Sequence, residues 1–203
     1  MDYQPNLAAA ITDAFQSDVF VRNKMDVQHE PIYDTVTIAA AGAVNSTTTA
    51  LFTNVGPAAG KTLADTNLTR AGELPSPEAF SIMAFRIYWN SDILRADLNT
   101  LLTNFAFQFI LGQKPYNTGP LWYYTAGAGI DGFTTRTSES AYTNGLPSRE
   151  AIRHLHIPIV IENTLGFSAS LQGTAFNLAA GAAGGTGLRL TCLLDGLHAR
   201  GVQ

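Results

Sequence analysis

Residues 105–111 read FAFQFIL, and every second side chain in this run is large and apolar. A period of two places Phe105, Phe107 and Phe109 on one face of an extended strand, so this strand has one face to bury. Two further stretches repeat the pattern, with Leu155, Ile157, Ile159 and Ile161 in one and Leu188, Leu190, Cys192 and Leu194 in the other. Such short alternating segments, separated by turns rich in Gly, Asn, Thr and Pro, predict an all-β sandwich or barrel.

On both sides of this strand, the sequence predicts further elements, about eight strands and two short helices in all. The strands are expected at 34–40, 47–53, 80–89, 105–111, 120–125, 152–162, 167–173 and 188–195. One helix is expected at 5–17, and a second begins at the polar residues 90–92 and ends at Asn104. Long loops are expected at 54–79 and 126–150. The predicted architecture is a single jelly-roll sandwich over 31–203, preceded by an N-terminal helix and arm over 1–30.

Charge is scarce in this chain. Only 14% of the 203 residues are charged, against roughly 25% in an average soluble domain. Because charged residues usually cover a solitary protein, the deficit indicates a surface of Thr, Ser, Asn, Gly and Ala, or one that largely meets other subunits. Both can hold, and the second indicates an assembly. The net charge is −4 and the cations are scattered, so no direct nucleic-acid binding is expected. The single Cys192 falls on the apolar face of its strand, which predicts a buried, inert thiol.

Two glycine-rich motifs come close to nucleotide-binding signatures. Residues 56–62 read GPAAGKT, but a P-loop has four residues between its glycines and opens onto a helix, whereas here there are three and no helical stripe follows. Residues 127–132 read GAGIDG and match the dinucleotide fingerprint, but no βαβ unit surrounds them. Both stretches are therefore predicted to be loops, and no cofactor is expected.

His154 and His156 are weak candidates for a metal site. Two residues apart on a strand, their side chains project from one face and could share an ion. The next carboxylate along the strand, Glu162, is roughly 20 Å beyond His156 at about 3.3 Å per residue, too far to join them without a bend. The pair is therefore expected to be structural or interfacial. A metal-dependent β-barrel enzyme stays open as a third interpretation.

The segment 116–124 concentrates four aromatic side chains, Tyr116, Trp122, Tyr123 and Tyr124. Tyrosine and tryptophan carry much of the binding energy at protein–protein interfaces, which predicts a subunit contact here. The same rings would also suit a platform on which sugars stack. In the N-terminal helix, Leu7, Ile11 and Phe15 recur at four-residue spacing and form an apolar stripe that needs a partner surface.

The order of the predicted strands across 34–195, the low-charge loops rich in Gly, Ala and Thr, and the ending LLDGLHARGVQ at 193–203 resemble a coat protein of a tailless icosahedral bacteriophage. Coat proteins of this kind contain a single or a double jelly roll. The resemblance implies a self-assembling capsid subunit, major or minor, without catalysis or a cofactor. Its long loops and N-terminal arm would contact neighbouring subunits, and its place would be the virion, assembled in the host cytoplasm.

The N-terminal arm refines this expectation. Arms that contact packaged nucleic acid are often basic, whereas the first thirty residues hold five Asp and Glu against two Lys and Arg. The inner surface is therefore expected to face another virion protein or an internal membrane. No apolar run approaches the roughly 18 residues that cross a bilayer, and the N-terminus lacks the order of a secretory signal, so export by the standard route is not expected. The alternative function is a lectin-like or receptor-binding β-sandwich head, with a concave site at Trp122, Tyr123 or Tyr124.

Overall fold

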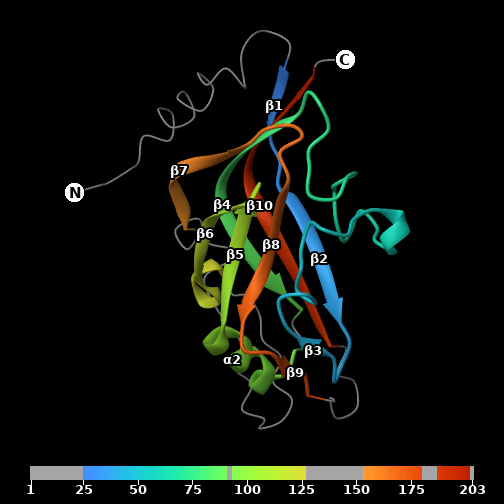
Figure 1. Cartoon of the computed structure of the whole chain (residues 1–203), viewed down its shortest axis with the longest axis vertical. Helices are drawn as coiled ribbons and strands as arrows, with labels where there is room; N and C mark the ends of the chain where they lie inside the picture. Colours follow the sequence, from blue (N-terminus) through green and yellow to red (C-terminus); the bar gives the residue numbers. More distant parts are fainter. Residues whose placement is uncertain (1–24, 91–92, 127–152, 180–186, 202–203) are drawn as a thin grey trace, which may run out of the picture.

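The computed structural model describes residues 25–90, 93–126, 153–179 and 187–201, and the statements below concern these residues (Figure 1). About half of them lie in antiparallel strands and few lie in helices, which confirms the expected mostly β class. The strands are β1 (Met25–His29), β2 (Ile32–Ile38), β3 (Ala43–Val44), β4 (Ala79–Trp89), β5 (Phe105–Leu111), β6 (Lys114–Pro120), β7 (His154–Ile161), β8 (Phe167–Gly173), β9 (Phe176–Asn177) and β10 (Leu188–Gly201). The helices are the 3-10 turns η2 (Pro57–Ala59) and η3 (Leu121–Tyr124) and the α-helix α2 (Arg95–Asn104).

The larger sheet is organised around β10, which runs along the molecule's long axis (Figure 1). β4 pairs with β10 on one side and β7 pairs with β4 in turn. On the other side, β1 pairs with the C-terminal half of β10 and β2 with its N-terminal half. These pairings are all antiparallel. They give the larger sheet the order β2–β10–β4–β7, with β1 in line with β2.

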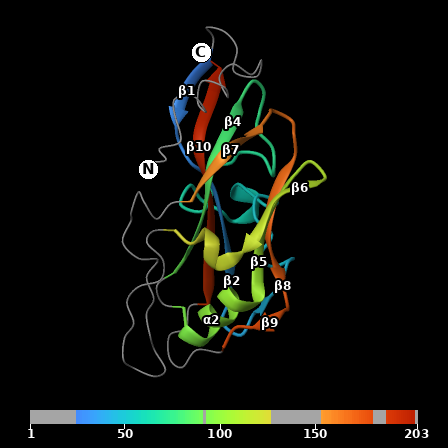
Figure 2. The ribbon, with the colours of Figure 1, turned by 90° about the vertical axis from the view of Figure 1, so that its left-hand side faces the viewer.

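The smaller sheet has the order β6–β5–β8 and faces the larger sheet (Figure 2). An isolated antiparallel bridge between Leu51 and Ala169 adds the chain around Leu51 to the outer side of β8. β3 and β9 form a separate two-stranded ladder near α2 (Figures 1 and 2). The helix is tied to the segment after β9 by Asp97, whose carboxylate accepts the N–H of Ala179 at 3.0 and 3.2 Å.

A β-bulge in β4 changes which of its side chains face the core. Ile82 pairs with Gly196 and Ala84 pairs with Asp195, so Met83 is the extra residue. Phe80 and Ile82 are buried before the bulge, and the buried set moves to Phe85, Ile87 and Trp89 after it. Gly196 is required here, because a Cβ at this position would lie 1.9 Å from the carbonyl oxygen of Ser81.

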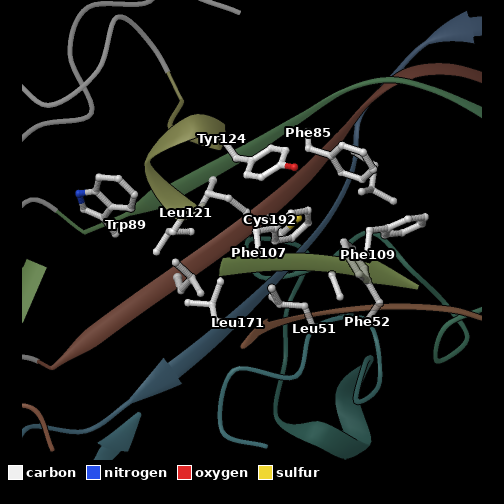
Figure 3. Close-up of a cluster of buried hydrophobic side chains, with 14 of the residues drawn as sticks. Leu51, Phe52, Phe85, Trp89, Phe107, Phe109, Leu121, Tyr124, Leu171 and Cys192 are labelled. Atoms are coloured by element: carbon white, nitrogen blue, oxygen red, sulfur yellow. The ribbon is translucent and has the colours of Figure 1, made fainter. Parts of the chain in front are cut away.

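The core lies between the two sheets and is rich in aromatic rings (Figure 3). Phe107 and Phe109 on β5 meet Phe85 on β4 at ring-centroid distances of 5.4 and 5.1 Å. Tyr124 of η3 closes the cluster at 4.9 Å from Phe107. Cys192 is fully buried in β10, as expected, and burial raises the pKa of its thiol well above the ordinary value.

Several predicted elements need correction. The strand expected at 47–53 is reduced to the bridge at Leu51, and the strand expected at 120–125 is the 3-10 turn η3, preceded by β6 where a turn was expected. Ile157 was assigned to a buried face but is 82% exposed, because the pairing of β7 with β4 is irregular around it. The last strand continues six residues beyond 195, and β1, β3 and β9 were not predicted.

Two predicted regions lie outside the described residues. They are the N-terminal helix with Leu7, Ile11 and Phe15, and nearly all of the loop expected at 126–150. The described end of the predicted arm, Met25–His29, forms β1 and belongs to the larger sheet. No helix of the described residues is both long and apolar enough to span a membrane.

Candidate interaction surface

The turn η3 divides its four side chains between the core and the solvent. Leu121 and Tyr124 are buried, whereas Trp122 is 60% exposed and Tyr123 is 45% exposed. Side chains three residues apart eclipse each other in a 3-10 helix, so positions 121 and 124 share the inner side. The spacing of the buried pair is therefore three, not the two that a strand would require.

Trp122, Tyr123 and Arg153 form a contiguous surface, here called the aromatic ridge. The rings of Trp122 and Tyr123 meet edge to face at 6.3 Å. The guanidinium of Arg153, which precedes β7, lies 5.7 Å from the centre of the Tyr123 ring, within cation–π range. The ridge thus combines three residue types that dominate protein–protein binding energy, all of them exposed.

The other two predicted aromatic residues are placed differently. Tyr116, on β6, is 50% exposed and is covered in part by the Lys114 ammonium at 5.5 Å from its ring centre. Tyr124 points into the core, and its hydroxyl donates a hydrogen bond to the side-chain oxygen of Asn117. Burial raises the pKa of Tyr124. Tyr124 therefore packs against the core beside Tyr123 and does not contribute an exposed ring to the ridge.

His154 and His156 both lie exposed on β7. Among the described residues, no group of three or more His, Cys, Asp or Glu side chains is arranged to hold a metal ion. Glu162, the next carboxylate after the pair, follows the far end of the same strand. Within the part of the chain that the structure describes, these histidines lie on an exposed stretch of β7 without a ligand set around them.

The near-P-loop at 56–62 cannot surround a phosphate in this conformation. The N–H groups of Ala59 and Lys61 donate to the carbonyl of Gly56, and the N–H of Gly60 donates to Pro57. The Lys61 ammonium lies 2.6 Å from the Asp34 carboxylate. The amides and the cation that a phosphate would need are already used, so the predicted loop interpretation holds for this motif. The other glycine motif, 127–132, lies outside the described residues.

The pair Asp34–Lys61 marks a polar region that sequence reasoning missed. Asp34 is fully buried, and its second oxygen accepts the N–H of Phe52 at 2.6 Å. Phe52 has a φ of 65°, an unusual value for a bulky residue, and Asp34 holds it there. The only sequence signal was an acidic residue in a strand whose neighbours alternate, at a position expected to face the core.

A pocket of about 430 Å³ opens beside this pair. Its lining is dominated by small polar side chains and is made of Thr35, Val36, Thr37, Thr47, Thr48, Ala50, Thr53, Asn54, Ala59, Gly60, Lys61 and Asp65. None of these is aromatic, so the pocket and the aromatic ridge are separate features. The hydrogen bonds of Asp65 to the backbone and side chain of Thr62, with the nearby Arg189 cation, lower the pKa of its carboxyl.

A second polar cluster joins β1 to β10. The Asp195 carboxylate binds His29 at 3.0 Å and also binds Arg86. Three residues further along β10, the His198 ring lies 3.1 Å from the Glu78 carboxylate (Figure 1 shows the strands). Burial and the nearby Arg200 cation lower the pKa of His198, against the opposing effect of Glu78. These groups are paired with one another, so the cluster fastens β1 to the sheet.

Comparison with family models, with curated proteins and with solved structures finds no match to this chain.

Proposed function

We propose that this protein is a self-assembling capsid subunit of a tailless icosahedral bacteriophage, and that it acts structurally and not as an enzyme. The observation that carries the proposal is the aromatic ridge, which exposes Trp122, Tyr123 and Arg153 together. Tryptophan, tyrosine and arginine are the residue types most enriched among the residues that dominate protein interfaces. On a chain of which only 14% is charged, such a cluster is better explained by a partner than by water.

The strand pairing supports a jelly roll as the finer description of the fold. Numbered along the chain, β2, the stretch at Leu51, β4, β5, β6, β7, β8 and β10 are strands one to eight. The pairs one–eight, two–seven, three–six and four–five are all present and antiparallel. This nesting is that of one long hairpin rolled into two sheets, which is how a jelly roll is built. Viral capsid domains are among the proteins that use this architecture, together with lectins and cupins.

In the proposed shell, the partner of each subunit is another copy of the same chain. The loops 54–79 and 126–150 and the N-terminal arm would supply contacts beside the ridge. Part of the first loop already covers the edge of β2, where Thr66 bridges Asp34. Other virion proteins or an internal membrane would lie against the acidic arm. Stable specific interfaces bury roughly 1,200–2,000 Å² in total, so the ridge would form only part of one.

Sedimentation velocity and negative-stain microscopy of the purified full chain test the proposal. We expect large closed particles from the natural protein. The double variant Trp122→Ala/Tyr123→Ala should shift the protein toward small species, because it removes the two exposed rings of the ridge. Leu165→Ala is the matched control, since Leu165 is an exposed apolar residue in the turn before β8 and should assemble normally.

Two outcomes would contradict this function. A monomer that persists at high concentration would exclude a shell subunit. A small closed oligomer such as a trimer, unchanged by the ridge variant, would instead favour the lectin-like head. Thermal melting of both variants checks that the changes are confined to the surface, where substitutions usually alter stability by about 0.5 kcal/mol or less.

A further inference from the structure

The edge of β2 that faces away from β10 is covered over only part of its length. At Tyr33 the cover is complete, because its N–H donates to the Asn67 side chain at 3.0 Å and its carbonyl accepts the Thr66 hydroxyl at 3.0 Å. Asn67 also donates to the carbonyl of Pro31. The polar side chains of the loop thus replace the backbone of a missing neighbouring strand at this end of β2.

The register of β2 shows which of its other backbone groups point outward. Because both groups of Tyr33 face away from β10, alternation along an antiparallel pair turns those of Thr35 and Thr37 outward as well. The partner strand agrees: Arg189, opposite Thr37, directs its N–H and C=O to Asn90 on the far side of β10. No side chain of the described residues covers Thr37 as Asn67 covers Tyr33.

The polar pocket lies at this edge, and Thr35 and Thr37 are part of its lining. Thr35 is buried beside the Asp34–Thr66 bridge, so the open part of the edge is at the exposed Thr37. Its charged side chains are already neutralised, Lys61 by Asp34 at 2.6 Å and Asp65 by Arg189 at 2.8 Å. Neither charge is therefore available to an ionic ligand, and the site offers the neutral backbone groups of the β2 edge to a matching ligand. A peptide backbone is such a ligand, and it repeats donors and acceptors at the spacing that a strand edge presents.

We propose that residues 18–24 of a second copy of this chain bind in the pocket as an added strand on β2. The segment contains Val19, Phe20 and Val21, and β-branched and aromatic residues favour strands. Their apolar side chains would meet Val36 and Ala50 in the pocket lining. The inference rests on the proposed self-assembly and names one contact through which it occurs.

The distance from Met25 to the pocket decides whether residues 18–24 come from the same subunit or from a second copy. Met25, where β1 begins, pairs with Gly201, whereas Thr37 pairs with Arg189, twelve residues away along β10. At about 3.3 Å per residue the two positions are roughly 40 Å apart along the strand. The segment 18–24 extends at most about 25 Å from Met25. It cannot reach the pocket of its own subunit, so a neighbour must supply it.

Photocrosslinking of assembled full-length protein tests the contact. Thr53, exposed at the pocket, is changed to Cys and labelled with benzophenone maleimide, while the buried Cys192 stays unlabelled. Copies carrying the probe are made in ¹⁵N medium and co-assembled with unlabelled natural copies. We expect a crosslink between the ¹⁵N probe peptide and the unlabelled tryptic peptide 1–22, localised by tandem mass spectrometry to residues 18–22.

The variant Thr37→Pro, made in the probe-carrying copy, removes one outward N–H and leaves the bonds between β2 and β10 in place. It should lower the yield of this crosslink by roughly fivefold to tenfold. Thr37→Val keeps the N–H and should crosslink at the natural yield. Val19→Pro/Val21→Pro, made in the unlabelled copy, tests the other side of the contact without touching the folded sheet, and should lower the yield similarly.

Three outcomes would overturn the inference: crosslinks confined to one copy, crosslinks to other peptides only, or a yield that none of the proline variants changes. Particle size, measured on the same samples, separates this failure from failure of the proposed function. Particles that form without the 18–22 crosslink refute this contact alone. Absence of particles in the natural protein refutes self-assembly itself.

Discussion

Loops lie along two margins of the larger sheet, part of the β2 edge and the end of β4 that extends beyond β7, and different interactions hold them there. At the β2 margin, Thr66 and Asn67 lie along the strand edge through directed hydrogen bonds, and the buried Asp34–Lys61 pair holds the loop beside them. At the β4 margin, Ala126 donates its N–H to the carbonyl of Ile87, and the cover is fastened by Tyr124 in the aromatic core. One margin depends on matched polar partners, and the other depends mainly on apolar burial.

This difference has a consequence for mutation. Burial of apolar area is not directional, so a ring can be replaced by another of similar volume at modest cost. A buried charge that loses its partner has no substitute, because desolvation is then uncompensated. At the β4 margin, the loss of stability should therefore depend on the side-chain volume that a mutation removes. At the β2 margin, it should depend on whether a single charged group keeps its partner.

The largest effect is expected in the aromatic core. Phe107 is fully buried and contacts both Phe85 and Tyr124. Phe107→Ala should lower the free energy of unfolding by about 4 kcal/mol, since a buried ring is lost and a cavity is left. Urea denaturation measures the change, and Phe107→Leu should recover more than half of it. A loss equal in the Ala and Leu variants would show that volume does not govern this margin.

Asp34→Ala should give the next largest loss, about 3 kcal/mol, because it leaves the mostly buried Lys61 ammonium unpaired. It also removes the acceptor for the N–H of Phe52, whose positive φ is then unsupported. The companion variant Asp34→Ala/Lys61→Met should be more stable than Asp34→Ala alone. If the second change brings no recovery in urea denaturation, the ion pair is not the interaction that stabilises this margin.

The strands that alternate regularly could be predicted from the sequence, and the features that break alternation could not. The predicted strand at 105–111 matches β5 residue for residue, because its inner face is continuously apolar. β4 was found, but its bulge was not, since Met83 suits a buried face as well as Ile82 does. The turn η3 was read as a strand because Tyr and Trp favour strands, whereas burial at a spacing of three decided its conformation.

The candidate surfaces could likewise be predicted only in part, where residue type alone gave a signal. Tyr116, Trp122, Tyr123 and Tyr124 were predicted to be contact residues from residue type alone; the first three are exposed and Tyr124 is buried. Arg153 was missed because it is thirty residues away in sequence and reaches Tyr123 only through the folding of β7. The pocket was missed because threonines that are scattered in the sequence carry no recognisable signal. Only the folded chain brings Thr37 and Thr47 to one place.

The smallest effect is expected from pH, at the polar cluster that fastens β1. In the folded chain, burial and the Arg200 cation lower the pKa of His198 below the ordinary value of 6.5, despite the facing carboxylates of Glu78 and Glu30. The unfolded chain therefore takes up a proton first as the pH falls. This contribution is fully present above about pH 6.5 and is lost as the pH decreases toward the folded pKa.

The free energy of unfolding, measured in urea between pH 8 and pH 5, should accordingly fall at the acidic end. His198→Gln should flatten this dependence, since glutamine keeps a polar partner for Glu78 but cannot titrate. His154→Gln is the matched control, because His154 is exposed on β7 and should leave the slope unchanged. A slope that survives in the His198 variant would assign the pH dependence to other groups, and the polar cluster would then act only as a fixed set of hydrogen bonds.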